Sequence, residues 1–334
     1  MYSFLSSNRI RTTGLILGII VLIVAMVASV ILGVTEVTIQ SALDAYLNFD
    51  NSNQHIIIRT VRLPRALIAA AVGASLAIAG ALMQALTRNP LASPAIFGVN
   101  AGAGFFIVIA VSFFSVSITE LTWFAFLGAG INSLAVYILG SSGREGLTPL
   151  KLTLSGAALT ALFSSLTQGL LVVNEKTLDE VLFWLTGSVA GRELEVLQII
   201  FPYLLIGWLG SFVMAKALDT LTMGEDIAKG LGQRILIVKI LVALIVILLA
   251  GGSVAIAGPI GFIGIIIPHI ARSLVGRDFR WLIPYCALLG AILLVLADIS
   301  ARFIIMPQEI PVGVMTAFIG TPFFVYIARR GFNK

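Results

Sequence analysis

The most regular feature of the sequence is a series of long charge-free windows separated by short polar segments. The windows span residues 12–35, 66–87, 89–119, 121–143, 152–174, 196–215, 240–271, 281–297 and 310–328. A helix needs about 20 mostly apolar residues to cross the ~30 Å hydrocarbon core of a bilayer. Seven of the nine windows fit one crossing each, so the pattern predicts a series of membrane-spanning helices.

The two remaining windows are longer. Window 89–119 begins with a Pro-bracketed turn at 89–94, before a helix near 98–114. Window 240–271 would be about 48 Å long as one helix, at 1.5 Å per residue. Gly258, Pro259, Gly261 and Pro268 interrupt its second half, so we expect the chain to turn there and cross back. The prediction is an all-α polytopic membrane protein with about ten spans, in one domain covering 1–334.

Composition supports this interpretation, because 11% of the residues are charged and 59% are hydrophobic. Soluble domains carry roughly 25% charged residues. Ten spans place both termini on one side, and cytoplasmic loops usually carry the excess of Lys and Arg. With both termini in the cytoplasm, fifteen of the 21 Lys and Arg residues are inside; the six outside are Arg59, Arg62, Arg65, Lys176, Arg192 and Arg302. The net charge of +5 therefore indicates membrane topology and not nucleic-acid binding.

Several chemistries are missing from the sequence. Cys286 is the single cysteine, and His55 and His269 are far apart, so we expect no disulfide, metal site or cofactor. No Gly-x-x-x-x-Gly-Lys-Ser/Thr loop is present to hold ATP phosphates. No acidic residue lies deep in a predicted span, although carriers coupled to ion gradients generally need one. The chain is therefore not expected to be an enzyme, and energy for transport would come from a separate subunit.

Arginines mark the outer end of the second span. Arg59, Arg62 and Arg65 recur every three residues, so on a helix they share a face. Arg302 follows Asp298 by one turn near the outer end of another span. Cations on this side suggest an anionic partner. The alternatives are side chains that snorkel to the interface, or Arg302 paired with Asp298.

The inner segment 218–232 has the pattern of a short docking helix. Thr222 and Glu225 form a capping-box pattern, and Gly230 and Gly232 can end the same helix. A two-turn helix between two spans suits a groove on a partner, although an ordinary interfacial helix is the alternative. The candidate residues are Thr222, Met223, Gly224, Glu225, Asp226, Ile227 and Ala228, with small Gly224 and Ala228 four positions apart.

A polar stripe runs along the fifth span. Thr160, Ser164, Thr167 and Gln168 fall on one helix face. Such a stripe could line a pathway for a polar solute. Hydrogen bonding between helices explains it equally well.

These motifs together resemble the permease subunits of type II ABC importers for ferric siderophores, haem and vitamin B12, the FecCD-type family. The N-terminal match is Arg-Leu-Pro-Arg at 62–65, the Gly-bounded run 73–80, Gln84, Asn-Pro-Leu-Ala at 89–92 and Gly98. The C-terminal match includes Gly261, Gly264, Pro268, Arg272, Asp298, Arg302, Pro311, Gly313, Gly320 and Pro322. The similarity covers nearly the whole chain.

The resemblance implies a bacterial cell-membrane complex of this subunit, a second permease subunit (identical or homologous), two ATPase subunits and an extracytoplasmic solute-binding protein. Arg62, Arg65 and Arg302 would pair with carboxylates of the binding protein. Segment 218–232 would receive motion from the ATPase, and the fifth span would line the path. The turn 147–149, with Thr148 and Pro149, would lie near an inner gate, although Pro149 departs from the small hydroxyl residue expected there.

The expected function is therefore that of the membrane-spanning subunit of an ATP-driven importer, which passes a ferric siderophore into the cytoplasm. Cobalamin or haem is the alternative cargo for the same architecture. A rival from another class is a secondary transporter or channel that works alone. Dependence of uptake on a partner ATPase distinguishes the two classes.

Overall fold

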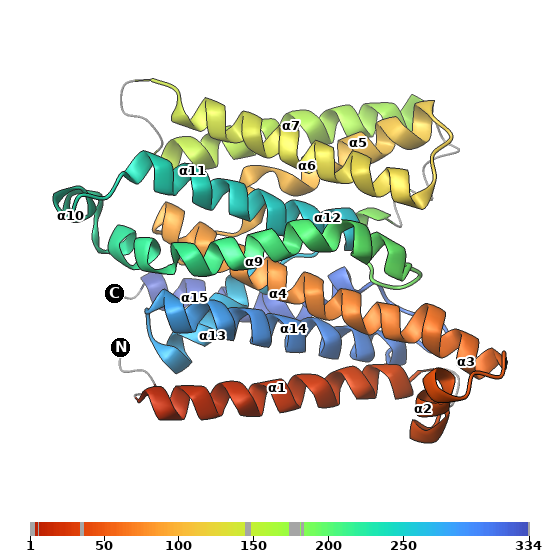
Figure 1. The fold of residues 1–334 in the computed structure, drawn as a ribbon. Coiled ribbons are helices and arrows are strands. Elements are labelled where there is room, and N and C mark those ends of the chain that lie inside the picture. Colours follow the sequence, from red (N-terminus) through yellow and green to blue (C-terminus); the bar gives the residue numbers. More distant parts are fainter. Residues whose placement is uncertain are drawn as a thin grey trace.

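The computed structural model describes residues 4–5, 7–33, 37–143, 148–173, 181 and 184–332. In this part of the chain all regular elements are helices, joined by turns and loops, and the one β-bridge pairs Ile305 with Gln308. Figure 1 shows the long helices side by side in one bundle. In order they are α1 (Asn8–Ile31), α2 (Ile39–Leu47), α3 (Asn53–Ile57), η1 (Ile58–Arg62), α4 (Leu63–Thr87), η2 (Pro94–Phe97), α5 (Val99–Phe113), α6 (Ile118–Ser141), α7 (Pro149–Val173), α9 (Leu194–Met223), α10 (Glu225–Gly230), α11 (Ile235–Val246), η4 (Ile247–Gly251), α12 (Gly252–Ala257), α13 (Ile263–Val275), α14 (Phe279–Phe303) and α15 (Val312–Phe332).

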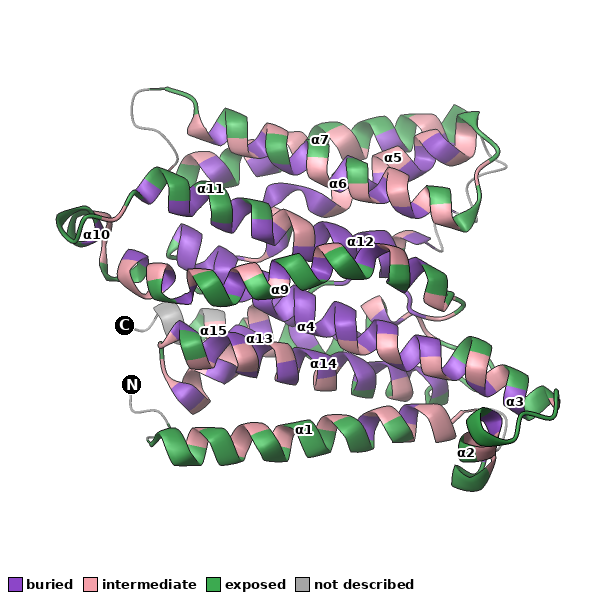
Figure 2. Cartoon of the chain, in the orientation of Figure 1, coloured by how far each residue is buried: buried purple, intermediate pink, exposed green. Residues whose placement is uncertain are grey.

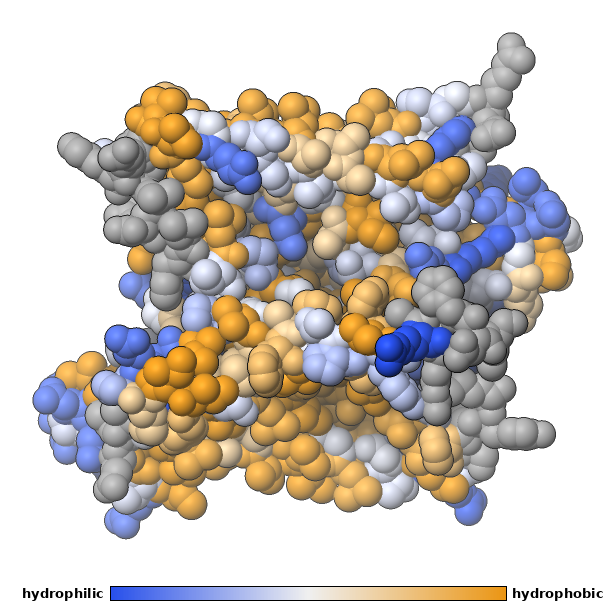
Figure 3. All heavy atoms as spheres, turned by 180° about the vertical axis from the view of Figure 1, so that it is seen from behind, coloured by the Kyte–Doolittle hydropathy of each residue, from blue (hydrophilic) through white to orange (hydrophobic). Residues whose placement is uncertain are grey.

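Seven helices of the described chain are long and apolar enough to cross a bilayer. They are Asn8–Ile31, Asn53–Thr87, Ile118–Ser141, Pro149–Val173, Leu194–Met223, Ile235–Ala257 and Phe279–Phe303. Three shorter apolar helices, Val99–Phe113, Ile263–Val275 and Val312–Ile327, occupy the other predicted windows. The prediction of an all-helical polytopic membrane protein is confirmed. Figure 3 shows the corresponding surface from behind, with a broad apolar area across the lower half of the view and strongly hydrophilic residues toward the left and right ends.

The predicted turn inside window 240–271 is also confirmed. α12 ends at Ala257 and α13 begins at Ile263. Gly258 between them has φ +71°, a conformation that residues with a Cβ rarely adopt. A Cβ there would also approach the Trp184 carbonyl oxygen to 2.5 Å. α13, with 13 residues, is the shortest of the seven long and three shorter apolar helices, as expected for the eighth predicted span.

α4 is the central helix, and 83% of its apolar window is buried (Figure 2). Its glycines allow this, because a Cβ on Gly80 would overlap the backbone of Gly264 in α13, and one on Gly73 would overlap Gly290 in α14. Lipid is as apolar as a leucine side chain, so membrane helices associate through such close backbone contacts. The bundle is thus built around α4.

α1 lies at the edge of the bundle, and only 11% of its apolar window is buried. It begins at the end of the bundle where α10 lies and where α15 ends, while α2 and α3 lie at the opposite end (Figure 1). The end with α10 is called the inner end below, and the opposite end the outer end. At the inner end, the Tyr285 hydroxyl donates to the Arg11 carbonyl at 2.7 Å and ties α1 to α14.

Candidate functional site

The outer arginines form a buried ion-pair cluster. Arg62, Arg65 and Arg302 are only 5%, 6% and 2% exposed. Arg65 donates from Nε and Nη2 to the Asp298 carboxylate at 2.8–2.9 Å, and Arg302 Nη2 donates to Asp298 Oδ2 at 2.5 Å. One carboxylate on α14 therefore holds two guanidinium groups, one from α4 and one from α14.

Other donors of Arg62 and Arg302 cap the outer end of α1. Arg302 Nη1 donates to the carbonyls of Ser29 and Leu32 at 2.7 and 2.9 Å. Arg62 Nη1 donates to those of Val30 and Ile31 at 2.9 and 2.6 Å. The last carbonyls of a helix have no partner within it and carry the negative end of its dipole. The two arginines thus satisfy these groups and attach the peripheral α1 to the bundle.

The cluster reaches solvent at Glu309. Arg65 Nη1 pairs with Glu309 Oε2 at 2.5 Å, and the Glu309 side chain is 33% exposed. Arg59 points elsewhere: its Nε donates to the Ala45 carbonyl at 2.5 Å, and its guanidinium lies 4.0 Å from the Phe49 ring centroid. The alternative that Arg302 pairs with Asp298 is confirmed. Direct contact of these arginines with a binding protein stays a prediction.

An outer cavity of about 540 Å³ adjoins this cluster. It is lined by Arg59, Thr60, Val61, Pro64, Gly191, Arg192, Glu193, Leu194 and Glu195. Burial lowers the pKa of the Arg192 guanidinium below its usual value, since desolvation disfavours the charged form. Glu193 and Glu195 are exposed. The outer surface that remains free for a partner therefore carries both signs of charge.

The inner segment differs from its prediction at the helix start. α9 continues through Met223, and the Thr222 hydroxyl donates back to the Asp219 carbonyl at 2.9 Å. Gly224, at φ +135°, breaks the helix and precedes the six-residue α10, so the predicted capping box of Thr222 and Glu225 is wrong. The physical reason is local. The positive φ of Gly224 ends α9 at Met223, so Thr222 lies inside α9 and cannot cap the next helix.

The surface of α10 also differs from the prediction. Ala228 is fully buried, so it cannot face a partner as expected. Exposed apolar side chains lie instead at Met223, Ile227 and Leu231, which are 64%, 53% and 69% exposed. Glu225 fixes α10 to the bundle through Lys239 Nζ at 3.0 Å. The exposed apolar residues Met223, Ile227 and Leu231 are called the α10 apolar face below. Met223 and Ile227 were among the predicted candidates, whereas Leu231 lay in the predicted segment without being singled out, although the four-residue spacing was readable.

The polar stripe of the fifth span lies on α7. Thr160 and Ser164 are half-buried, Thr167 is buried, and Gln168 is exposed. Thr160 lies beside Gly98, because a Cβ on that glycine would sit 3.3 Å from its hydroxyl oxygen. Thr167 donates to the Phe163 carbonyl at 2.8 Å. Three of the four residues are therefore at least half-buried, the hydrogen bond of Thr167 stays within α7, and Gln168 lies on the open face. A role of the stripe in the path stays a prediction.

The predicted gate residues lie at the start of α7. The Lys151 amide donates to the Thr148 hydroxyl at 3.3 Å, and Pro149 is the first residue of the helix. Proline suits that position, since its missing N–H would be unpaired there in any case. Residue 147 is outside the described residues. A gating role for Thr148 and Pro149 stays a prediction.

No group of three or more His, Cys, Asp or Glu side chains that could hold a metal ion occurs in the described part of the chain. The site consists instead of a buried ionic cluster at the outer end, an exposed apolar face at the inner end, and a helix bundle between them. Together with the broad apolar area of the surface (Figure 3), this arrangement defines a polytopic membrane permease.

The sequence model of the FecCD transport family matches residues 21–330, and the chain belongs to this family. It is 60% identical over 314 residues to the probable siderophore transport system permease protein YfiZ of Bacillus subtilis, covering 94% of each chain. It is 40% identical to the ferric enterobactin transport system permease protein FepD of Escherichia coli, covering 97% of this chain and 96% of the relative. A solved inward-facing metal-chelate type ABC transporter matches with TM-score 0.84 and 32% identity, covering 96% of this chain and 99% of the other.

The resemblance stated from the sequence is thereby confirmed. The chain is a multi-pass membrane protein and a permease component of a bacterial ABC importer. Such permeases are transport subunits without catalytic activity of their own, as expected from the missing phosphate-binding loop. Membership in an import system implies an ATPase and a binding protein as partners.

Proposed function

We propose that this chain passes a ferric siderophore across the cytoplasmic membrane, after receiving it from an extracytoplasmic binding protein. The observation that carries the proposal is 60% identity over 94% of both chains to a relative named as a probable siderophore permease. Relatives named for ferric citrate and ferric enterobactin match over nearly the full length as well. Permeases named for ferric chelates of different chemistry thus share this fold. A ferric chelate is therefore the proposed cargo of this chain.

The proposed topology has ten spans and both termini in the cytoplasm. It is supported by α1 starting, and α15 ending, at the inner end (Figure 1). Lys216, Lys229, Arg234, Arg277 and Arg280 also belong to segments at this end. An excess of Lys and Arg in short loops is typical of the cytoplasmic side.

One of the two ATPase subunits is proposed to bind at the α10 apolar face of this chain. Met223, Ile227 and Leu231 are exposed to an aqueous phase in this topology, where an isolated apolar cluster marks an interaction site. Glu225 pairs with Lys239 at 3.0 Å, so a push on α10 is passed to α11. Gly224 permits this movement, because no side-chain cap fixes the start of α10. Thr222 and Asp226 lie at the edge of this surface.

The binding protein is proposed to dock at the outer end. Arg62 and Arg302 are committed to the carbonyls of α1, which supports an indirect role in which they hold the docking surface in shape. Arg65 is the best placed of the three for direct pairing, since its partner Glu309 is one-third exposed. A carboxylate of the binding protein could replace Glu309 there.

The translocation path is proposed to run along the open face of α7, closed by a second permease subunit. Ala157, Ala161, Ser165, Gln168 and Gly169 are exposed on this face. Small side chains leave room for a bulky chelate, and the Ser165 hydroxyl and Gln168 amide provide polar contacts. Gln168 was predicted from the sequence to line the path, and this proposal keeps it there. Thr160, Ser164 and Thr167 were predicted to line the path as well, and the exposed residues of this face take their place in the proposal.

The cargo is tested by uptake into liposomes that contain the complete importer. Radioactive ferric siderophore is supplied with the purified binding protein, and unlabelled hydroxamate, catecholate and citrate chelates, haem and cobalamin compete in separate reactions. We expect at least one ferric chelate to be imported and to be displaced only by ferric chelates. Import of cobalamin or haem, with no ferric chelate transported, would refute the siderophore assignment.

A further inference from the structure

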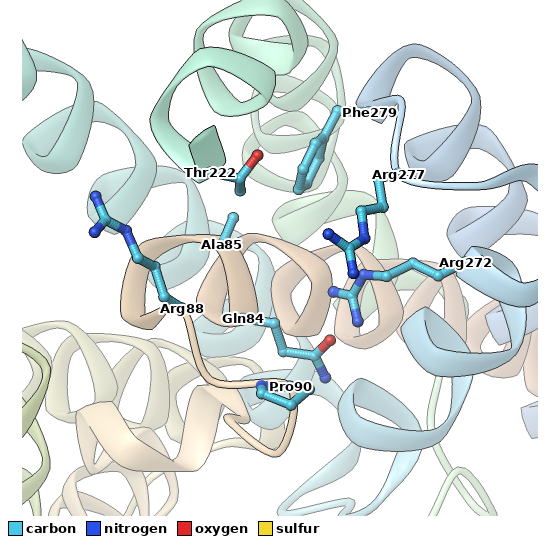
Figure 4. A pocket seen from close by; sticks show the side chains of 8 residues that line it. All are labelled: Gln84, Ala85, Arg88, Pro90, Thr222, Arg272, Arg277 and Phe279. Carbon is cyan, nitrogen blue, oxygen red and sulfur yellow. The ribbon is translucent and has the colours of Figure 1, made fainter. Parts of the chain in front are cut away.

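A basic cavity of about 290 Å³ lies at the inner end of the bundle, where α4, α9 and α13 end and α14 begins. Figure 4 shows its lining: Gln84, Ala85, Arg88, Pro90, Thr222, Arg272, Arg277 and Phe279. The charged members of this set are three arginines, and none of the described acidic residues lines the cavity. The volume equals that of roughly ten waters at about 30 Å³ each, so a phosphate group fits.

Two of the arginines lack a counter-ion. Neither Arg272 nor Arg277 donates a hydrogen bond or forms an ion pair with a described residue. Figure 4 shows their guanidinium groups next to each other, and their positive charges repel. Each guanidinium carries five N–H donors in a fixed fork. An anion between them would remove the repulsion and satisfy several of these donors.

Gln84 provides an independent indication of a ligand. Its side chain is 4% exposed, and its Nε2 donates to the Gly264 carbonyl at 3.2 Å, which fixes the orientation of the amide. Its Oε1 is buried and accepts a hydrogen bond from no described residue. In Figure 4 this oxygen is directed toward the side of the cavity with Arg272 and Arg277. A buried acceptor without a donor has lost its water without compensation, so a ligand hydroxyl would suit it.

The carboxylates of this region have other partners. Asp219 accepts from the Phe279 amide at 2.9 Å, and Asp278 accepts from the Arg280 amide at 3.0 Å. Glu225 pairs with Lys239 at 3.0 Å and lies 3.7 Å from Arg88. Arg88 is therefore partly compensated, while Arg272 and Arg277 remain available to an incoming anion.

We propose that this cavity binds the phosphate of an anionic phospholipid whose head group carries a free hydroxyl, as in phosphatidylglycerol and cardiolipin. The proposal rests on the proposed topology, which puts this end at the cytoplasmic leaflet. Phosphate oxygens pair with Arg272 and Arg277, whose planar forks match phosphate geometry. The glycerol hydroxyl donates to Gln84 Oε1. Basic pockets between membrane helices on the cytoplasmic side are suited to such head groups.

An apolar crevice explains why a lipid is a better occupant than free phosphate. It has a volume of about 470 Å³ and is lined by residues of α1, α4, α9 and α14. Three of these helices, α4, α9 and α14, also contribute residues to the basic cavity. Along α14 the crevice begins at Pro284, five residues or about 8 Å from Phe279 of the basic cavity, at 1.5 Å per residue. Half of the hydrocarbon core is ~15 Å. The inner end of the crevice therefore lies at the depth that acyl tails of the cytoplasmic leaflet reach.

The test is native mass spectrometry of the purified full chain after incubation with two kinds of vesicle, phosphatidylcholine alone or with added cardiolipin. We expect wild-type protein to retain one cardiolipin and to lose it in Arg272→Gln/Arg277→Gln, with affinity reduced at least about tenfold. Arg280→Gln is the matched control, since Arg280 is exposed near the cavity without lining it. Arg277→Gln alone, at an exposed position, serves if the double variant fails to fold.

A separate arm adds inorganic phosphate to protein in phosphatidylcholine vesicles. Thermal stabilisation by phosphate, with no cardiolipin retained, would overturn the lipid assignment. Equal cardiolipin retention by wild type and both cavity variants would also overturn the lipid assignment. The same holds if the variants retain the lipid and lose only the binding of the ATPase subunits. Because retention is measured without transport, a failure of this site and a failure of the proposed importer function are separate results.

Discussion

Replacing Asp298 with asparagine should destabilise the protein severely, because this carboxylate is 1% exposed and compensates two buried guanidinium groups. The substitution keeps the volume and one acceptor but removes the charge. Arg65 and Arg302 then share one uncharged amide oxygen in place of the carboxylate that both contact at 2.5–2.9 Å. Removing one partner of a buried ion pair costs about 3–5 kcal/mol, since an uncompensated charge remains. We expect Asp298→Asn to lose this amount of unfolding free energy.

The assay is thermal unfolding in lipid nanodiscs, where a loss of that size lowers Tm by at least about 5 °C. Glu309→Gln is the matched control, because Glu309 pairs with Arg65 from a side chain that is 33% exposed. A pair of that kind contributes about 0–1 kcal/mol. The reasoning is refuted if Asp298→Asn unfolds at the wild-type temperature, or if both variants lose the same stability.

The other predictions concern packing, coupling and the path. Gly80→Leu should lower the unfolding free energy by about 3 kcal/mol or more, and Tm with it, because a side chain there would overlap the Gly264 backbone. Unchanged unfolding would refute this contact. Ile227→Asp should abolish ATP-driven uptake with Tm preserved, whereas Ala228→Leu, at a buried position, should lower both uptake and Tm. Normal uptake by Ile227→Asp would exclude the α10 apolar face as the coupling surface. Gln168→Leu should reduce chelate uptake measurably while Thr167→Val does not, and the reverse ranking would place the path on the other face of α7.

The spans and their connections were predictable from the sequence because lipid imposes one dominant constraint. Every backbone polar group in the bilayer must be paired within the protein, so apolar windows become helices. The return at Gly258 was readable for a related reason, since glycine and proline interrupt a window too long for one crossing. Both features depend on local composition and on the thickness of the membrane.

The partners of the arginines were not predictable, because they depend on tertiary contacts. Arg65 reaches Asp298 and Glu309 from far away in the chain, and Arg302 reaches carbonyls of α1. A triad of cations at a membrane surface is equally compatible with an external and an internal partner. Only the packing of α1 beside α14 shows that the carbonyls are near.

The inner helix shows the opposite limitation, a local pattern with two solutions. Thr222 and Glu225 fit a capping box, but Gly224 between them can also end a helix that arrives from the membrane. α9 is a long helix anchored by packing, and its continuation through Met223 overrides the capping preference. Burial of Ala228 then follows from the direction in which α10 leaves Gly224.

The central claim, that this chain is one part of an ATP-driven importer, is tested most directly by reconstitution into liposomes. The chain alone, under an imposed proton or sodium gradient, should take up no radioactive ferric chelate. Uptake should appear when a second permease subunit, the ATPase pair, the binding protein and ATP on the cytoplasmic face are all present, and should stop when ATP is omitted. Gradient-driven uptake by the chain alone would contradict the account.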